Sequence, residues 1–339
     1  MFLSKKKKRA KTVKRRCLQV ADFITNFIYS LIRIATPIIF VALSSTISQQ
    51  AGLLNMAAEA MMLTSALAGV MFSAICQNVW LGILGGMLAS VALALFLCWA
   101  SFVMKVDLYL MSISLNMALV GGTVFVVYLV TGTKNTTAGV VQSLALENID
   151  IPFIKDIPVI GAIFSGHNLF TYIALAMTFV VWYLLFRTKL GLRIRASGQN
   201  PQAVESVGIN PRKIYTLSFV LAAAIGSLGG MYLSMGYQTY FIRNITANRG
   251  FIGMAAATIA DGMPVGSLIM SFVFGLAYAI TNYLKPYIVD AYFMSALPFL
   301  LIIVFYFLMS AYRSQQEERR LKAARKRLDE EQMKRQAKT

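Results

Sequence analysis

The chain has 339 residues, of which 58% are hydrophobic and only 14% are charged, and its mean hydropathy is +0.65. A soluble globular domain carries about 25% charged residues, so this composition excludes that class and indicates a polytopic membrane protein. The net charge of +18 does not indicate nucleic-acid binding, because 19 of the 32 Lys and Arg residues lie in residues 1–16 and 312–339, where basic tails set membrane orientation and contact anionic membrane lipids.

Residues 1–19 form a basic N-terminal tail that we expect in the cytoplasm. A transmembrane domain follows over residues 20–311. Its first apolar stretch, residues 20–50, contains Pro37, which predicts a broken or kinked helix there. The next apolar runs are each long enough to cross a bilayer, and they predict spans at 56–76, 79–103 and 108–130.

The longest polar connection, residues 131–168, is predicted to be an extracellular loop. The second half of the domain contains a basic loop at 187–213, predicted to be cytoplasmic, and a charged C-terminal tail at 312–339, also predicted to be cytoplasmic. Between these segments the apolar runs predict spans at 169–186, 214–236, 263–284 and 292–310, with a short apolar segment at 250–262.

Parity decides how many crossings these segments make. If both tails and the 187–213 loop are cytoplasmic, one more crossing is needed in residues 23–55, around Pro37, and another in residues 237–262. The predicted fold is therefore an all-α polytopic membrane protein with about ten transmembrane helices, some of them broken.

The two segments with extra crossings share a sequence pattern. Residues 52–58 read GLLNMAA and residues 250–256 read GFIGMAA. The similarity predicts two pseudo-repeat halves. Broken apolar segments at matching places in two halves are also a pointer to a transport site.

The basic loop contains the stretch GLRIRASGQNPQAVESVGIN, residues 191–210. Asn200 suits a helix cap, Pro201 suits the first helical position and Gly208 suits the residue just past a helix end. The stretch therefore predicts a short capped helix. Two interpretations stay open: a docking surface for a cytosolic partner, and a solvated loop whose cations only set orientation.

Three stretches carry a resemblance to a known family. The stretch AGLLNMAAEAMML at 51–63 is similar to G-V-V-N-I-G-x-E-G-x-M-L. Residues 191–210 are similar to G-x-R-x-R-A-x-G-x-N-P-x-A-A-x-x-x-G-I. The stretch NRGFIGMAAATIADGMPVGSLIMSFVFG at 248–275 is similar to G-R-G-F-I-A-L-A-A-x-I-F-G-x-x-x-P-x-G-A-x-x-A-x-x-F-G. SISLNMAL at 112–119 is a weaker match. The chain resembles the permease subunit of an ABC importer of the simple-sugar and nucleoside type, related to the branched-chain amino acid permeases.

The chain departs from that family's pattern in two places. Ala57 and Ala60 stand where the family has glycine, and Gln49-Gln50 stands where it often carries a charged pair. Either difference changes the width or charge of the transport path, so the resemblance leaves the detailed substrate open.

The resemblance implies a bacterial plasma-membrane protein that works with other subunits. These are a cytoplasmic ABC ATPase subunit, a second permease subunit in a heterodimer, and an extracellular substrate-binding protein. The 191–210 loop would then supply the helix that docks on the ATPase. The candidates for ATPase coupling are Gly191, Arg193, Arg195, Gly198, Asn200, Pro201, Ala203 and Gly208.

Four polar residues in or beside apolar segments are candidates for the substrate path. Glu59 and Asn55 lie one helical turn apart and should share a face, where an amide and a carboxylate suit polyhydroxylated ligands. Asn116 lies within a predicted span, and Arg249 lies beside Gly250 at a break. The alternative for Glu59 is a structural carboxylate that is paired with backbone amides or a neighbouring helix.

No residue pattern supports bond-making chemistry, so we expect no catalytic residues, no metal site, no cofactor and no enzyme activity. His167 is the only histidine, the three cysteines lack metal-ligand spacing, and no GxxxxGK[ST] motif is present. The expected function is that of an ABC importer permease for a nucleoside or simple sugar. The alternatives are a permease for another small solute, such as a branched-chain amino acid, and a proton-coupled secondary transporter with Glu59 as the proton carrier.

Overall fold

A computed structural model provides the structure. It describes residues 2–146, 148–149, 161, 165–285, 296, 299–300, 302–312, 314–316, 318–319 and 321–322, and for residues 2–22 it describes the backbone only. The chain divides into two compact units, Met1–Ala279 and Ile280–Thr339. The elements discussed below belong to the first unit, apart from the last turn of α11 (Pro264–Leu284).

The first helix, α1 (Phe2–Gln50), is continuous through Pro37, so the predicted break at that proline is wrong. Proline has no N–H and leaves the carbonyl four residues earlier without its helical partner. Here that carbonyl belongs to Arg33, and the Tyr232 hydroxyl donates a hydrogen bond to it at 3.0 Å. A side chain from another helix therefore satisfies the group that Pro37 leaves free, and the helix continues.

Seven described helices are long and apolar enough to cross a membrane, so the chain is a multi-pass, mostly helical membrane protein. Polar caps begin several of them: Asn78, Asp107 and Asn168 each accept a hydrogen bond from a backbone N–H in the first turn. The spans are Phe23–Gln50 of α1, α2 (Ala58–Cys76), α3 (Val79–Phe102), α4 (Leu108–Thr131), α6 (Leu169–Arg187), α9 (Pro211–Met231, continued by the π-helical segment Tyr232–Tyr237) and α11.

These bounds confirm the predicted spans to within a few residues, except at the two broken segments. The predicted span 292–310 lies partly outside the described residues. The short apolar segment forms α10 (Arg249–Ile259), whose eleven residues are too few to cross a bilayer as a helix.

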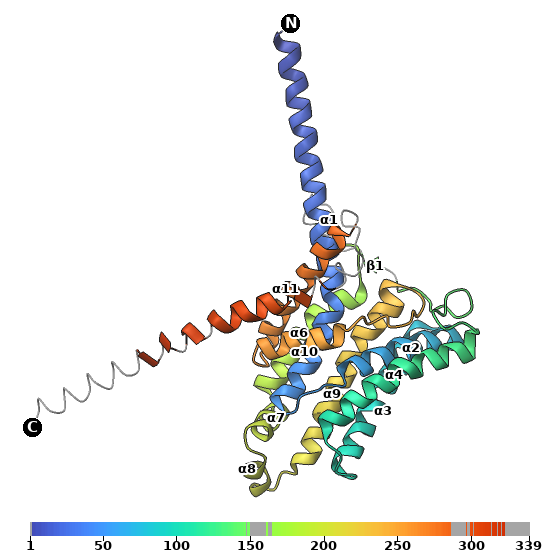
Figure 1. The fold of residues 1–339 in the computed structure, drawn as a ribbon, viewed down its shortest axis with the longest axis vertical. Helices are drawn as coiled ribbons and strands as arrows, with labels where there is room; N and C mark the ends of the chain where they lie inside the picture. Colours follow the sequence, from blue (N-terminus) through green and yellow to red (C-terminus); the bar gives the residue numbers. More distant parts are fainter. Residues whose placement is uncertain are drawn as a thin grey trace, which may run out of the picture. The chain divides into compact units, whose positions relative to one another are not determined.

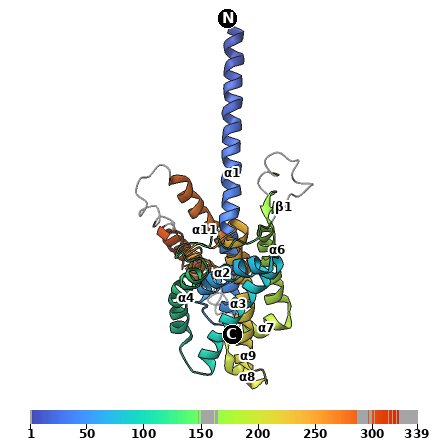
Figure 2. The ribbon, with the colours of Figure 1, turned by 90° about the vertical axis from the view of Figure 1, so that its right-hand side faces the viewer.

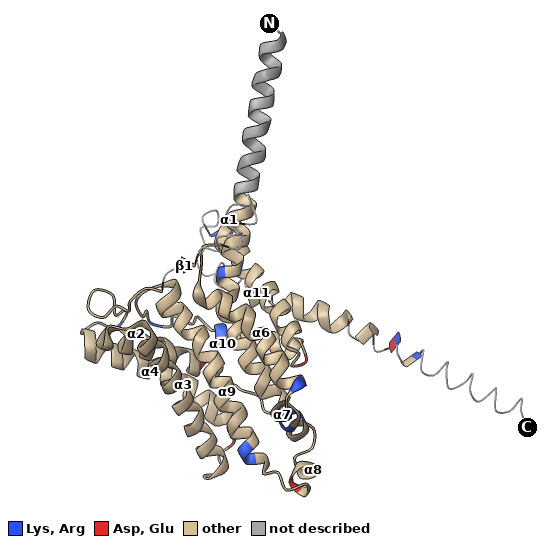
Figure 3. Cartoon of the chain, turned by 180° about the vertical axis from the view of Figure 1, so that it is seen from behind, with Lys and Arg blue, Asp and Glu red and all other residues tan. Residues whose placement is uncertain are grey.

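The spans connect two ends of the first unit (Figure 1). The α7–α8 end carries α7 (Lys189–Gln199), α8 (Pro201–Ser206) and the start of α9. The β1–β2 end carries the antiparallel pair β1 (Asn148–Ile149) and β2 (His167–Asn168), together with a bridge between Thr136 and Ile242. Figure 3 shows charged residues in α7, in α8 and at the start of α9, all at the α7–α8 end.

The direction of α1 follows from contacts near its two ends. The Tyr29 hydroxyl donates to the Gly166 carbonyl at 2.9 Å, at the β1–β2 end. The Gln50 amide donates to the Gly262 carbonyl at 2.8 Å, in the turn between α10 and α11. The span of α1 therefore runs from the β1–β2 end to the α7–α8 end.

The core of this unit lies where α1, α2 and α9 pack together (Figures 1 and 2). In each of these helices, 61% of the residues in the most apolar 18-residue segment are buried, whereas only 17% are buried in the corresponding segment of α4. Small residues allow the close approach. At Gly86 of α3, for example, an added Cβ would lie 2.5 Å from the Met231 sulfur and 2.8 Å from the Ser65 carbonyl oxygen.

The two segments with the shared GxxxMAA pattern differ in backbone structure. Gly52 lies in a turn after α1 with φ +79°, and α2 begins only at Ala58. Gly250, at the matching position, is the second residue of α10. The predicted pseudo-repeat halves are therefore not confirmed at the local level.

Candidate functional site

The predicted capped helix in the basic loop is confirmed as α8. The Asn200 side chain accepts a hydrogen bond from the Ala203 N–H at 3.1 Å, and Pro201 is the first helical residue. Gly208 has φ +78°, a conformation that favours glycine, and its N–H bonds the Glu205 carbonyl. These caps define α8 without help from the rest of the fold.

A second, longer helix precedes it. Thr188 caps α7, because its hydroxyl accepts from the Gly191 N–H at 3.1 Å and donates to the Leu184 carbonyl at 2.6 Å. An added Cβ on Gly191 would overlap the carbonyl oxygens of Leu184 and Leu185. Gly191 therefore permits the tight corner between α6 and α7.

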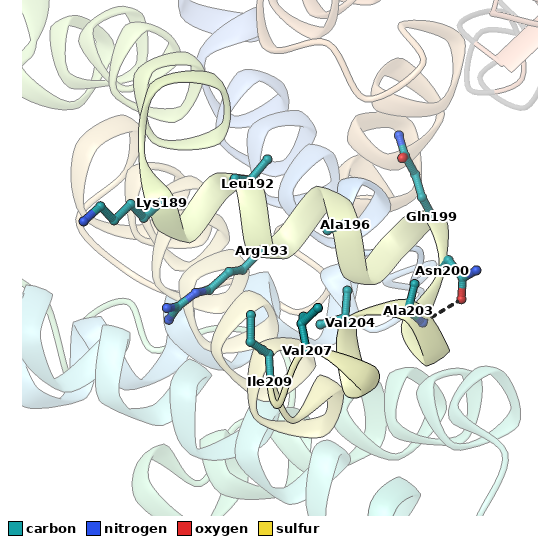
Figure 4. A pocket seen from close by; sticks show the side chains of 10 residues that line it. All are labelled: Lys189, Leu192, Arg193, Ala196, Gln199, Asn200, Ala203, Val204, Val207 and Ile209. Atoms are coloured by element: carbon teal, nitrogen blue, oxygen red, sulfur yellow. Dashed lines mark hydrogen bonds between the residues drawn. The ribbon is translucent and has the colours of Figure 1, made fainter.

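The two helices enclose a groove of about 510 Å³, shown in Figure 4. Its apolar side chains include Leu192 and Val207, which are 61% and 71% exposed. Arg193 is also exposed and lies along the same groove, so the surface combines apolar contact area with positive charge. The lining consists of Lys189, Leu192, Arg193, Ala196, Gln199, Asn200, Ala203, Val204, Val207 and Ile209.

Arg195 does not line this groove. Its Nε donates to the Leu185 carbonyl at 3.0 Å, and its guanidinium carbon lies 4.8 Å from the centre of the Phe186 ring. The side chain therefore satisfies the C-terminal end of α6 and holds α7 against it.

Gly198 connects α7 to the end of α1. An added Cβ on Gly198 would overlap the Gln50 carbonyl oxygen and would lie 2.8 Å from the Gly52 nitrogen. An added Cβ on Gly52 would lie 2.9 Å from the Gly198 Cα. The backbones of α7 and of the turn after α1 thus touch directly, and through the Gln50–Gly262 hydrogen bond that turn also touches the junction of α10 and α11.

Glu59 caps the N-terminus of α10. Its carboxylate accepts hydrogen bonds from the Thr246 hydroxyl at 2.5 Å, the Asn248 N–H at 3.0 Å and the Gly250 N–H at 2.6 Å. The helix dipole places partial positive charge at that position, which stabilises the carboxylate further. Glu59 is 3% exposed, so it joins the starts of α2 and α10 inside the protein.

Asn116, in the middle of α4, pairs with backbone groups at the start of α2. Its Oδ1 accepts from the Ala60 N–H at 2.9 Å, and its Nδ2 donates to the Met56 carbonyl at 2.7 Å. Both groups belong to the non-helical turn and first residues that begin α2. The amide of Asn116 therefore replaces the backbone partners that the break at residues 51–57 removes.

Asn55 and Arg249 each have one polar atom without a hydrogen-bond partner among the described residues. Asn55 is 1% exposed, and its Oδ1 makes no hydrogen bond within the described chain. Arg249 donates from Nη1 to the Ile245 carbonyl at 3.1 Å and lies 5.9 Å from the Tyr278 ring centre, but its buried Nε makes no hydrogen bond with the described residues. Unpaired buried polar atoms are costly, so a partner outside the described residues would stabilise both side chains.

The structure places several of the predicted residues in two groups, while Gly191, Arg195 and Gly198 hold α7 against α6 and the end of α1. Glu59, Asn116 and Arg249 lie around the broken starts of α2 and α10, and Arg193, Asn200 and Ala203 lie on the α7–α8 groove. Sequence reasoning did not identify Gln50 or Thr246 as parts of these contacts. The described residues contain no group of three His, Cys, Asp or Glu that would hold a metal ion.

Comparison with known proteins identifies the family. Residues 27–306 match the family described as the permease component of the branched-chain amino acid transport system. The guanosine ABC transporter permease NupQ of Bacillus subtilis is 28% identical, with 78% of this chain and 84% of NupQ covered. The nucleoside ABC transporter permease NupC of Lactococcus lactis is 27% identical over 76% of this chain and 83% of its own.

A relative with a different stated cargo is also similar. The putative glucose ABC transporter permease TsgC13 of Haloferax volcanii is 27% identical, with 76% of this chain and 78% of TsgC13 covered. No solved structure matches the chain. Because the family match extends over most of the chain and over nearly all of the seven described spans, this protein belongs to the family of ABC transporter permease components that includes the branched-chain amino acid permeases.

Proposed function

We propose that this permease forms the transport path of an ABC importer for a nucleoside or a simple sugar. The observation that carries the proposal is the α7–α8 groove together with the contact between Gly198 and the turn after α1. An ATPase subunit bound in the groove would move α7, and that movement would reach Gln50 and the α10–α11 junction directly. The path is expected to pass the broken starts of α2 and α10, where Asn55 and Arg249 have polar atoms that no described residue pairs with.

The cargo assignment rests on the relatives and on the polar character of these groups. Relatives that cover most of this chain are named for guanosine, nucleosides and glucose. All of these solutes carry hydroxyl groups, which both donate and accept hydrogen bonds. They therefore match the Oδ1 of Asn55 and the Nε of Arg249, neither of which has a partner among the described residues. A branched-chain amino acid is the second candidate, supported by the family description; inhibition of uptake by leucine but not by guanosine would favour it.

The ATPase, a second permease subunit and an extracellular substrate-binding protein are proposed partners. This chain is similar to two guanosine permeases of Bacillus subtilis, NupQ and NupP, and to two nucleoside permeases of Lactococcus lactis, NupC and NupB, so each organism contains two such permeases. The α7–α8 surface is therefore assigned to the ATPase, and the β1–β2 end to the substrate-binding protein.

The same assignment gives a membrane topology. With the α7–α8 end in the cytoplasm, α1 begins on the extracellular side and residues 238–262 cross back as a loop followed by α10. The seven described spans, this crossing and the predicted span 292–310 make nine crossings. Because this number is odd, the two tails would lie on opposite sides of the membrane. We therefore propose that the C-terminal tail is cytoplasmic and the N-terminal tail is extracellular, which revises the expectation of ten crossings with both tails inside.

The test of the docking surface is co-purification of the importer from gently solubilised membranes. We expect the ATPase surface to carry negative charge that complements the groove. Arg193→Glu would then place like charges against each other, which is strongly unfavourable, so recovery of the ATPase should fall roughly tenfold or more. Arg243→Glu is the matched control, because Arg243 is exposed and lies in the 238–248 loop of the β1–β2 end. Arg195→Glu is unsuitable, because it would also break the contact with α6.

Two results would contradict the proposal. Equal loss of the ATPase in both variants would show that net charge, and not the groove, controls recovery. Uptake by the purified chain alone, without any ATPase, would favour a secondary transporter. In that case the Glu59→Gln variant would identify or exclude the proton carrier.

A further inference from the structure

A second groove lies on the outer surface of the α3–α9 pair, close to the α7–α8 end. Its volume is about 580 Å³. On α3 it is lined by Leu95 and Trp99, among others, and on α9 by Leu217 and Val220. It shares no lining residue with the α7–α8 groove and contains none of the residues at the broken starts of α2 and α10.

The wall of this groove is apolar and uncovered. Leu95, Trp99 and Leu217 are 45%, 51% and 38% exposed, although all three belong to membrane-spanning helices. On α3 the lining residues recur at helical spacing, as they do on α9, so each helix contributes one continuous ridge. Two parallel apolar ridges with a channel between them fit an extended hydrocarbon chain.

Two cations close the groove at one end. Arg212 and Lys213 line it and are exposed, and they belong to the first turn of α9. That turn contains no acidic residue, and within the part of the chain that the structure describes neither cation forms an ion pair. Asp107, the N-cap of α4, is not among the lining residues and accepts a hydrogen bond from the Leu110 N–H. A bound anion would therefore offset both charges and the positive end of the helix dipole.

We propose that this groove is a binding site for an anionic phospholipid. The phosphate lies between Arg212 and Lys213, and one acyl chain follows the groove past Trp99 and Val220. Lys213 and Val220 are seven residues apart on α9, which corresponds to roughly 10 Å of groove. Tryptophan side chains favour the headgroup level of a bilayer, which agrees with the position of Trp99 beside the cations.

The test is native mass spectrometry of the purified importer complex after addition of phosphatidylglycerol or of phosphatidylcholine with the same acyl chains. We expect the wild type to retain phosphatidylglycerol preferentially. Arg212→Gln/Lys213→Gln should lower that retention roughly 25-fold, since each cation near an anionic lipid contributes about fivefold. Lys134→Gln/Arg243→Gln removes the same charge from the β1–β2 end and should change nothing.

A second variant tests the acyl channel without changing the cations. Val220→Trp fills the groove and should lower retention of phosphatidylglycerol. Inorganic phosphate should not change the amount of phosphatidylglycerol that the protein retains. The site is refuted if the wild type retains both lipids equally, if the matched control loses as much lipid as the double variant, or if Val220→Trp retains lipid normally. Displacement of the lipid by millimolar inorganic phosphate would show an ion site in place of a lipid site.

Discussion

At the scale of single residues, the broken helices are held by side chains from other helices. Glu59 of α2 satisfies the start of α10, and Asn116 of α4 satisfies the start of α2. Membrane interiors contain no water to replace these bonds, so each break needs such a partner. These two residues therefore act as structural caps, whatever contact with solute they also make.

Removing the Glu59 carboxylate should destabilise the protein strongly. Glu59→Ala leaves the buried N–H groups at the start of α10 without an acceptor, which we expect to cost about 3 kcal/mol or more. Glu59→Gln keeps one acceptor oxygen and should cost about 1–2 kcal/mol. Thermal unfolding of the purified complex measures both. The exposed Glu205→Gln serves as the control; a Glu59→Ala variant as stable as this control would contradict the capping role.

Part of the contribution of the Tyr232 hydroxyl to stability should depend on Pro37. Tyr232→Phe removes the donor to the Arg33 carbonyl, with an expected loss of about 1–2 kcal/mol. In a Pro37→Ala background the N–H of residue 37 can bond that carbonyl, so the same change should cost much less. Unfolding of both single variants and the double variant gives the coupling energy, and independent effects would disprove the link.

At the scale of elements, the decisive contact is between α7 and the turn after α1. The Gly52 and Gly198 backbones leave no room for a side chain, and Gln50 extends the contact to the α10–α11 junction. One surface of α7 forms the proposed ATPase groove, and Gly198 is not among its lining residues. The helix is therefore placed to transmit movement from a partner to the membrane segments.

Gly198→Ala should separate docking from coupling. The added methyl group overlaps the Gln50 carbonyl and forces α7 away from α1, with an expected loss of stability of about 1–3 kcal/mol. Because the groove itself is unchanged, the ATPase should still co-purify, but substrate-stimulated ATP hydrolysis should fall several-fold. Gly121→Ala makes the same change in α4, where an added Cβ has no neighbour within 4 Å, and should leave hydrolysis unchanged.

At the scale of the whole molecule, the two ends of the first unit present different surfaces, as the proposed assignment of partners requires. The end with α7 and α8 carries the groove and the cations of the basic loop, and the opposite end carries β1, β2 and the paired loops at residues 136–143 and 239–242. This asymmetry is what an importer needs if it receives solute on one side and hydrolyses ATP on the other.

The direction of α1 leads to a prediction about the tails. Single cysteines introduced at Lys189 and at Lys134, in a variant without native cysteines, should react with an impermeant thiol reagent from the cytoplasmic and extracellular sides respectively. A tag at the N-terminus should be accessible in intact cells, and a tag at the C-terminus only after permeabilisation. Protection of the N-terminal tag would instead support the expectation from the basic tail.

The sequence alone was sufficient for the class, for the spans between residues 56 and 284 outside the broken segments, for α8 and for the family. Hydropathy over about 20 residues is a local property, and the capping of α8 by Asn200, Pro201 and Gly208 involves only neighbours in the chain. The family follows from motifs whose residues are likewise local, and the match to residues 27–306 confirms it.

Only the tertiary structure decided how the interruptions are resolved. The sequence predicted a broken or kinked helix at Pro37, but α1 is continuous there, because the Tyr232 hydroxyl, 199 residues away from Arg33, donates to the Arg33 carbonyl. The partner of Glu59, Gly250, is 191 residues away, and the Gln50–Gly262 contact spans 212. Such pairings depend on how helices pack, which no local pattern encodes, so the sequence located the broken segments and the fold determined what holds them.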